Sequence, residues 1–461
     1  MSVLVEKMGG LMGNNQLRVG EPRLCRLVVG DPDAPKTVVM LRDTGDAIEA
    51  TFPISGMAGS GGAYDRWWSR GITYGDDPDR VNYSYSPPSV MLLHDSSGSV
   101  VLIGCRATGR ERMLNAGKGI IIADFAVLGG KSLDYDQING MRTTSPAYRH
   151  WMGGSSISIN RDADQSDRLQ SLTLSLKRVE DFQVSQKFGL SARLDWKVMP
   201  VLGGYDVRET LAFETLVEDP RTWSAHLDLH LAVLDLISIA AWKNCAFGEI
   251  YVNRKDDPEK ALGGNVVSAR WPEVVSHVLP GDDVSDCGKN FLFAYNDASS
   301  GVIDIWFQLK MDYGRALDYL LRILRSGHTW SPQSAVISSI ALEQLGYLIE
   351  DHDNSRSHLD NRGQLHFKDA LGVILDDMEA IPIGCDDVEG WKERCRNVYM
   401  GAKHADREEA DHLTMLNTLR ENLLVLRYWI AQRLGVSGDV LERNLARDPL
   451  KSGFVAGPDA V

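Results

Sequence analysis

The sequence predicts an α+β protein in which a β-rich N-terminal region precedes an all-α helical bundle. Two observations lead to this prediction. Short β-branched runs bounded by Gly, Asp and Pro fill the N-terminal part of the chain, as expected of strands. From about residue 302 the apolar residues recur at three- and four-residue steps, which is the period of packed helices. We therefore expect a β-rich domain over residues 1–301, a helical domain over 302–445 and a disordered tail over 446–461.

The N-terminal part contains several runs that are typical of strands. One of them, "VMLLHDSSGSVVLIGC", predicts a hairpin, because a Ser-Ser-Gly turn separates two apolar segments. Another, "LQSLTLSLKRV", alternates apolar and polar residues as a half-buried strand does. We expect a sandwich or barrel-like sheet with one or two helices. The remaining predicted strands are "RLCRLVVG", "KTVVMLRD", "AIEATFPI", "YDVRETLAFETLVE", "FGEIYVNR", "VVSARW" and "FLFAYN".

One helix is predicted within the β-rich region, over "WSAHLDLHLAVLDLISIAAW". Leu227, Leu231 and Leu234 recur on one side of it at helical spacing. His226 and His230 lie four residues apart and could be two metal ligands. A zincin motif would need Glu after the first His, where this sequence has Leu227, and no third ligand is evident. Packed or surface histidines are the simpler interpretation.

Four amphipathic helices joined by short links predict the C-terminal bundle. The second begins after Ser331, with Pro332 in its first turn, which is a helix-start signal. The fourth has the longest apolar stripe and stops at Gly435. The helices are expected in "IDIWFQLKMDYGRALDYLLRILRS", "SPQSAVISSIALEQLGYLIED", "FKDALGVILDDM" and the segment whose stripe is Leu416, Leu419, Leu423, Leu426, Ile430 and Leu434.

Composition excludes several classes of protein. The net charge of −14 over 461 residues argues against coating of nucleic acid or anionic membrane, although it leaves room for one local basic site. Six cysteines without a C-x-x-C pair indicate free thiols in a reducing compartment. The first residues lack a basic start followed by an apolar run, and no stretch of about 18 apolar residues occurs. We expect a cytoplasmic protein that does not bind membranes, with no metal and no cofactor.

One basic stretch interrupts this acidic chain. It is "WKERCRNVYMGAKHADR", residues 391–407, whose five cations and two acids give a charge of +3. A guanidinium suits phosphate because its planar donors bind two oxygens at once and keep their charge. A histidine can take or give a proton near neutral pH. Arg396, Asn397 and His404 thus contain the groups that RNA strand cleavage needs without a metal. From residue types alone, however, a solvated helix end is the commoner explanation.

The order of the pieces resembles a known family. An Arg and a polar residue, then a His ahead of the final bundle helix, resemble the HEPN ribonuclease domain, and the "RN…KHADR" version looks most like its ApeA-type branch. That branch occurs in bacterial proteins of abortive infection against phage. The family also has a β-rich N-terminal domain with a late helix, here "LDLHLAVLDLISIA", followed by a Trp-Phe helix, here Trp306-Phe307. The similarity extends over roughly residues 200–440, and "FAVLGGKSLDYDQINGM" is of the same strand-rich type.

The resemblance implies a metal-independent RNA endonuclease. In that assignment Arg396 stabilises the phosphorane, His404 is the general base or acid, and Asn397 orients one of them. The products would be a 2′,3′-cyclic phosphate and a 5′-hydroxyl. HEPN domains pair, so a homodimer or higher homo-oligomer is implied, with RNA (tRNA is one candidate) as substrate and a phage component acting on the N-terminal sensor domain. The cations that would bind RNA phosphates are Arg394, Lys403 and Arg407.

The spacing of the two main residues leaves alternatives open. Seven residues separate Arg396 from His404, more than is usual between the HEPN pair. On an uninterrupted helix they would lie about 80° apart around the axis. A break at Gly401 would bring them together, or Arg394 or Lys403 would supply the cation instead. A further alternative is a non-catalytic HEPN-fold module that recognises a partner through its β domain and dimerises through its helices.

Other segments could hold a ligand. "AGKGII" and "GMAGSGGAYD" are rich in Gly, but neither has a phosphate-loop pattern that enters a helix, so we interpret both as turns. "DHDNSRSHLDNRGQLHF" has His and Asp residues that could bind a cation. Because its Asp, Asn, Ser and Gly are turn formers, we expect it to link two helices instead.

Overall fold

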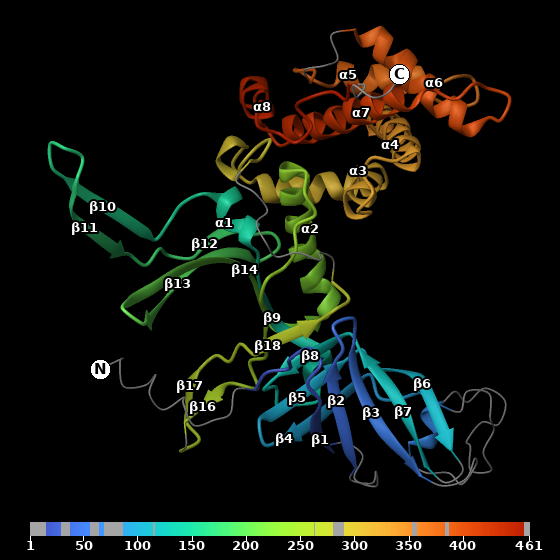
Figure 1. Ribbon diagram of the computed structural model, residues 1–461. Coiled ribbons are helices and arrows are strands. Elements are labelled where there is room, and N and C mark those ends of the chain that lie inside the picture. The colour runs from blue at the N-terminus through green and yellow to red at the C-terminus, as the bar shows by residue number, and fades with distance from the viewer. Residues whose placement is uncertain are drawn as a thin grey trace. The chain divides into compact units, whose positions relative to one another are not determined.

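The chain forms two compact units in a computed structural model (Figure 1). The first unit comprises Met1–Thr143, Glu214–Asp228 and Glu249–Leu279, and the second comprises Thr144–Phe213, Leu229–Gly248 and Pro280–Val461. They interleave along the chain, unlike the consecutive ranges that the sequence indicates. The predicted α+β class is confirmed, since strands fill the N-terminal region and helices the C-terminal one. The structure describes residues 15–28, 37–55, 64–68, 86–113, 116–261, 263–279, 290–352, 357–382 and 387–455.

The first unit is built on an antiparallel sheet with the strand order β9-β15-β18-β8-β5-β4-β1-β2-β3-β7-β6. Successive side chains of a strand point to opposite faces of the sheet, so every second side chain enters the core. In β2, Val39 and Leu41 are buried while Val38 and Met40 are exposed. The strands are β1 Arg23–Val28, β2 Val38–Asp43, β3 Ile48–Ser55, β4 Val90–Asp95, β5 Gly98–Ile103, β6 Arg106–Met113, β7 Ala116–Ala123, β8 Phe125–Leu128, β9 Gln137–Thr144, β15 Ile250–Asn253, β18 Glu273–Ser276 and the separate pair β16 Glu259–Lys260 and β17 Val266–Ser268.

The predicted hairpin is confirmed as β4 and β5, with Asp95 opposite Gly98. Asp95 also joins β4 to β1. Its two carboxylate oxygens accept hydrogen bonds from Nε and Nη2 of Arg23, each at 2.8 Å, and both side chains are largely buried. Burial acts to raise the pKa of Asp95, but the hydrogen bonds from Arg23 and from the Ser97 backbone outweigh it and lower the pKa to about 2.

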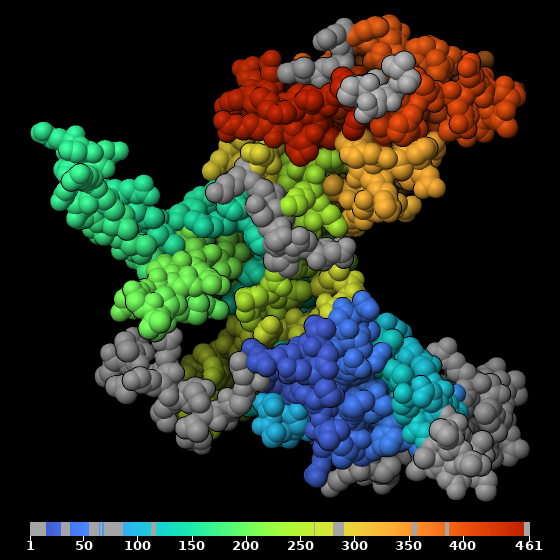
Figure 2. Space-filling model, viewed as in Figure 1, coloured from blue at the N-terminus to red at the C-terminus, as the bar shows by residue number. Residues whose placement is uncertain are grey.

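The second unit has β strands at its N-terminal end. "LQSLTLSLKRV" forms the predicted strand β11, but the expectation that it is half-buried is wrong, because its residues are almost all exposed. Its only strand partner among the described residues is β10, and Ile159 opposite Leu174 stays open to water. The hairpin extends as an arm in Figures 1 and 2. The elements here are α1 Pro146–Met152, β10 Ile157–Ala163, β11 Leu169–Leu176, β12 Phe182–Ser185, β13 Leu190–Val201 and β14 Gly204–Thr222, whose residues from Glu214 belong to the first unit.

One predicted strand is absent from the described part of the chain. "FLFAYN" forms bends and a short 3₁₀ helix, Tyr295–Asp297. Leu292 and Phe293 are buried, but the Leu292 N–H donates to the carbonyl of Ala240 at 2.8 Å, at the end of helix α2 (Trp223–Ala241). The apolar residues therefore cover a helix end instead of joining a sheet.

The helical region begins at Val302, where the apolar period of the sequence changes. The predicted helices correspond to α2, α3, α4, α5 and α7, and the sequence did not predict α6 or α8 as helices. α2 is long and apolar enough to cross a membrane, but most of its most apolar stretch is buried inside the protein. The helices are α2 Trp223–Ala241, α3 Val302–Arg325, α4 Pro332–His352, α5 Phe367–Asp376, α6 Val388–Lys403, α7 His412–Arg433 and α8 Gly438–Leu445.

The segment after α8 is ordered as far as it is described, which corrects the expectation of a disordered tail from residue 446. The Asp448 carboxylate accepts from Nη1 and Nη2 of Arg427 at 2.8 Å each, and both side chains are almost fully buried. Nε and Nη2 of Arg427 also donate to the carbonyls of Ile239 and Ala240, at 2.9 and 3.0 Å. A buried guanidinium on α7 needs this carboxylate, so the segment packs against α7. Residues 456–461 lie outside the described part.

The Arg23–Asp95 pair predicts how the first unit responds to acid. Because the folded-state pKa of Asp95 lies below its ordinary value of 3.8, the stabilisation is complete above about pH 4 and is lost as the pH falls towards 2. Asp95→Asn should lower the free energy of unfolding at pH 7 by about 2 kcal/mol, measured by urea unfolding, with a smaller loss at pH 3. Glu21→Gln, in the exposed pair with Arg18, should change little. An equal loss at both pH values would contradict this role.

The buried pair of α7 predicts a strong dependence on the C-terminal segment. Asp448→Asn leaves the Arg427 guanidinium buried without a countercharge, so the free energy of unfolding should fall by about 3–5 kcal/mol. Urea unfolding followed by circular dichroism measures the loss. Lys451→Ala, at an exposed position of the same segment, is the control and should be neutral. Wild-type stability of the Asp448 variant would show that the segment is not needed.

Candidate functional site on helix α6

The basic stretch forms helix α6 and its C-terminal end. The helix begins after Asp387, whose carboxylate accepts from the Gly390 N–H at 2.9 Å as an N-cap. Trp391, Cys395 and Val398 are buried and recur at helical spacing, so this face packs on the bundle. The charged residues consequently lie on the flanks and on the outer face of the helix.

Buried polar contacts fix α6 against two other helices. The side-chain oxygen of Asn422, on α7, accepts from Trp391 Nε1 at 3.2 Å and from Cys395 Sγ at 2.9 Å. Its amide nitrogen donates to Ser338 Oγ, on α4, at 3.0 Å. All four side chains are almost completely buried. Because a buried amide must satisfy its donors and acceptors, this network determines the rotation of α6 about its axis.

Arg394 lies on the flank of α6 that faces α7. Its Nη2 donates to both carboxylate oxygens of Glu421, at 3.1 and 3.2 Å. Burial raises the pKa of Glu421, and the charge of Arg394 opposes this rise without cancelling it. The guanidinium therefore already has an anionic partner within the bundle.

Arg396 lies on the other flank, towards α5. Its Nη1 donates to Oε1 of Glu393, one turn earlier, at 3.0 Å, and Glu393 also pairs with Lys368 of α5. Both cations lower the pKa of Glu393, and the hydrogen bond from Lys368 has the larger effect. About 39% of the Arg396 side chain is exposed, so the guanidinium can still meet an anion from solvent.

The remaining predicted residues lie at the end of the helix. His404 is the C-cap, its N–H donates to Met400 O at 3.0 Å, and its side chain is exposed. Lys403 Nζ lies 5.1 Å from the centroid of the Tyr399 ring. Arg407 is exposed in the following turn, where its N–H donates to His404 O at 3.0 Å. Asn397 is exposed on the outer face of the helix.

Gly401 does not break the helix, which continues to Lys403; that possibility is therefore wrong. A Cβ at Gly401 would lie 2.7 Å from the carbonyl oxygen of Glu408, so the glycine lets the segment after the helix pass close to it. His404, the C-cap, lies eight positions after Arg396, so the unbroken helix separates the two residues by about 12 Å along the axis and about 80° around it. One copy of α6 does not bring the two side chains onto a shared phosphate.

The other sequence candidates are packing or turn residues. Nδ1 of His226 is 2.8 Å from Thr215 Oγ1, and burial lowers the pKa of the imidazole. His230 is also buried. Among the described residues no group of three His, Cys, Asp or Glu side chains could hold a metal ion. The segment between α4 and α5 is a linker with a tight turn at Asp360, as expected from its turn formers; its Asp353 lies outside the described residues.

Two further expectations concern glycines and thiols. "AGKGII" lies within strand β7, so its interpretation as a turn is wrong, and most of "GMAGSGGAYD" lies outside the described residues. The expectation of free thiols is confirmed for the four described cysteines, which are buried. Cys287 and Cys385 lie outside the described residues.

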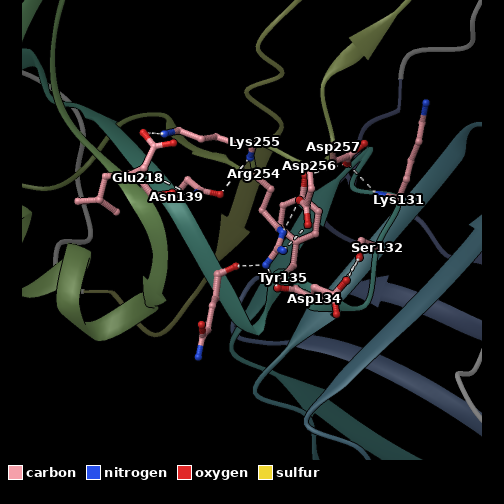
Figure 3. A network of polar contacts seen from close by, with 12 residues as sticks. Lys131, Ser132, Asp134, Tyr135, Asn139, Glu218, Arg254, Lys255, Asp256 and Asp257 are labelled. Atoms are coloured by element: carbon pink, nitrogen blue, oxygen red, sulfur yellow. Dashed lines mark hydrogen bonds and ion pairs between the residues drawn. The ribbon is translucent and has the colours of Figure 1, made fainter. Parts of the chain in front are cut away.

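The first unit holds a polar network that the sequence did not indicate (Figure 3). Arg254 is nearly buried; it donates to Asp256 at 2.8 Å and to Gln137 O at 2.8 Å. Tyr135 Oη donates to Asp257 at 2.9 Å, and burial and that carboxylate raise the pKa of the phenol. The side chains point at one another and at backbone carbonyls. Because these contacts use the donors internally, the network holds the connecting loops in place.

Comparison with known proteins identified one family. The sequence model described as "ApeA N-terminal domain 1" matches residues 29–306, which is more than half of the chain. The matched range covers the strands from β2 to β18 and α2, and it ends near the start of α3. Neither the curated proteins nor the solved structures contain a match.

The close approach at Gly401 predicts a measurable cost of adding one methyl group. Gly401→Ala should lower the free energy of unfolding by about 1–3 kcal/mol, because the Cβ forces the Glu408 backbone away from α6. Gly314→Ala is the matched control: this glycine lies in α3 with open space around it, so the change should stabilise by about 0.5–1 kcal/mol. Thermal unfolding compares the two. Equal stabilisation by both changes would contradict the contact.

Proposed function

This chain belongs to the ApeA family, and from this premise we propose that it is a metal-independent RNA endonuclease whose helical region, α3 to α8, is a HEPN-type domain. Membership of the family indicates a role in anti-phage defence. The observation that supports nuclease activity is the solvent-facing side of α6. Arg396 and Lys403 lie seven residues apart, as do Asn397 and His404, so each pair is aligned within about 20° around the axis.

The chemistry follows from these groups. His404 takes the proton from a ribose 2′-hydroxyl, whose oxygen attacks the adjacent phosphorus. Arg396 stabilises the extra negative charge of the phosphorane with its planar N–H donors. The His404 imidazolium formed in this way gives its proton to the departing 5′-oxygen. The P–O5′ bond breaks, and the products are a 2′,3′-cyclic phosphate and a 5′-hydroxyl, with no change of oxidation state and no metal.

The unbroken helix favours a site shared between two copies. A two-fold axis that passes close to Met400 would pair two antiparallel α6 helices. Residues equally far from Met400 would then face each other, so Arg396 of one copy would meet His404 of the other. Asn397 and Lys403 would pair in the same way. Two basic faces in one cleft would also strengthen the field that holds RNA on an acidic protein, and binding would weaken with added salt.

The β-rich region would be the sensor of this nuclease. The family match lies almost entirely in that region, separate from the proposed cleavage residues of α6. In this proposal a phage component binds to the N-terminal region and releases a restraint on the helical region.

A second function is favoured by other contacts of the same helix. Arg394 is paired with Glu421 and Arg396 with Glu393, and one chain keeps Arg396 far from His404. Ion pairs of this kind also suit a non-catalytic HEPN-fold module that recognises a partner and dimerises. Overexpression separates the two functions: a nuclease arrests growth and loses toxicity with His404→Ala, whereas a binding module leaves growth unchanged.

The nuclease is tested with purified protein and end-labelled RNA in EDTA. Wild-type protein should cleave and leave cyclic phosphate ends. His404→Ala should lower the cleavage rate by about 10²–10⁴-fold, because the general base is removed, and Arg396→Ala by about 10²–10³-fold. Arg447→Ala, at an exposed arginine of the segment after α8, should cleave normally. Cleavage by His404→Ala at the wild-type rate would disprove the mechanism.

The shared site is tested by mixing inactive chains. A dimer of one Arg396→Ala chain and one His404→Ala chain keeps one complete site, made from Arg396 of one copy and His404 of the other. Half of the dimers in an equal mixture are of this kind, so about a quarter of wild-type activity should return. If both residues must come from the same chain, the mixture stays inactive.

A further inference from the structure

The helical region contains a cavity of about 440 Å³ that the proposed cleavage residues do not line. This volume is within the usual range of small-ligand sites. One wall comes from α3, one from α4 and one from the segment between α4 and α5. The lining includes Arg315 of α3, Glu343, Gln344 and Tyr347 of α4, and Gln364 and Leu365 of the linking segment.

The linking segment is held rigidly at the edge of the cavity. The Asp360 carboxylate accepts from the N–H groups of Arg362 and Gln364, at 2.8 and 2.9 Å, and the Asp360 N–H donates to Gln364 O at 2.8 Å. These backbone N–H groups lower the pKa of Asp360, so the turn stays closed by an ionised carboxylate at neutral pH. Gln364 and Leu365 are thereby placed before any ligand arrives.

Glu343 is held in the wall that α4 forms. Tyr399 Oη, on α6, donates to Glu343 Oε2 at 3.2 Å. Burial, and then the charge of Glu343, raise the pKa of Tyr399 to about 12, so the phenol keeps its proton and remains a donor at physiological pH. The hydrogen bond fixes the direction in which Glu343 presents its carboxylate.

The lining suits a flat, uncharged ligand that has donors and acceptors along its edge. The charges of Arg315 and Glu343 cancel, which disfavours a phosphate as the main ligand. Gln344 and Gln364 each provide an amide that can both donate and accept. The Tyr347 ring, with 42% of the residue exposed, offers a face for stacking, and Leu365 is apolar. These properties are those of a nucleobase site.

The cavity is connected to the helix of the proposed cleavage site. Tyr399 lies three residues after Arg396 and four before Lys403, on the same flank of α6. The Lys403 ammonium lies over the Tyr399 ring, and that ring also contacts Phe367 of α5 at 5.1 Å between centroids. A ligand that contacts Glu343 thus reaches the hydrogen-bond partner of Tyr399, and Tyr399 lies between Arg396 and Lys403 along α6.

The geometry points to a nucleobase-binding cavity beside α6, which takes either a base of single-stranded RNA next to the cleaved bond or the base of a free mononucleotide. For RNA the inference rests on the proposed function. For a free nucleotide the inference does not depend on the proposed function. The cavity is then an effector site that is connected to α6 through Glu343 and Tyr399.

The test is calorimetric titration of the full chain with AMP, GMP, CMP and UMP, and with ribose 5-phosphate as the ligand that lacks a base. At least one nucleotide should bind, and ribose 5-phosphate at least tenfold more weakly. Tyr347→Ala should weaken binding about tenfold or more, because the stacking face is lost. Tyr347→Phe keeps the ring and should bind normally. Tyr205→Ala removes a tyrosine that is 76% exposed on β14 and is the matched control.

Titration with a short single-stranded RNA distinguishes the two sources of the base. If Tyr347→Ala weakens both RNA and nucleotide binding, the base belongs to RNA; if it weakens nucleotide binding alone, the ligand is a free nucleotide. If no nucleotide binds and RNA binding is the same in Tyr347→Ala and wild type, the inference is wrong. If the protein still cleaves RNA in that case, the proposed nuclease function stands without the nucleobase site. If the protein binds a nucleotide but never cleaves RNA, the nucleobase site stands without the nuclease function.

Discussion

The helical region depends on one buried charge. Arg427 lies within α7 with no exposed surface, and its guanidinium donates to two carbonyls at the end of α2 and to the Asp448 carboxylate. Without these acceptors the buried cation would cost several kcal/mol. α7 can therefore be buried on all sides only when the end of α2 and the segment after α8 are both in place. This requirement makes distant parts of the sequence fold as one bundle.

The position of α6 follows from the burial of α7. Asn422 precedes Arg427 on the same helix, and its amide has to find its partners inside the protein, on α6 and α4. These hydrogen bonds of Asn422 turn the face of α6 that carries Trp391 inward. Arg396 then lies partly exposed and His404 exposed to solvent. The proposed site is thus positioned by buried polar groups behind it.

Hydrophobic period predicted most of the strands and the long helices, because burial of one face leaves a visible repeat. It did not predict α6, where the buried Trp391, Cys395 and Val398 are separated by charged residues that hide the repeat. "FLFAYN" shows the opposite error: an apolar run was buried, but it covers the end of α2 rather than extending a sheet. The ordered segment after α8 was missed because its anchor, Asp448, is a polar residue whose partner is distant in sequence. No local pattern announces such a pair, and the cavity beside α4 is likewise formed only by tertiary packing.

The separation of Arg396 from His404 has a different meaning when two copies form the site. Within one chain the spacing would have to bring both groups to a single phosphate, which an unbroken helix prevents. Between two antiparallel copies of α6 related by an axis midway between the two positions, each Arg would lie level with a His of the other copy. The spacing would then set the distance between two equivalent sites, about 12 Å along the helix, and the direction in which each side chain points around it. A longer interval is therefore compatible with the proposed catalysis in a dimer, provided that the two-fold axis passes close to Met400.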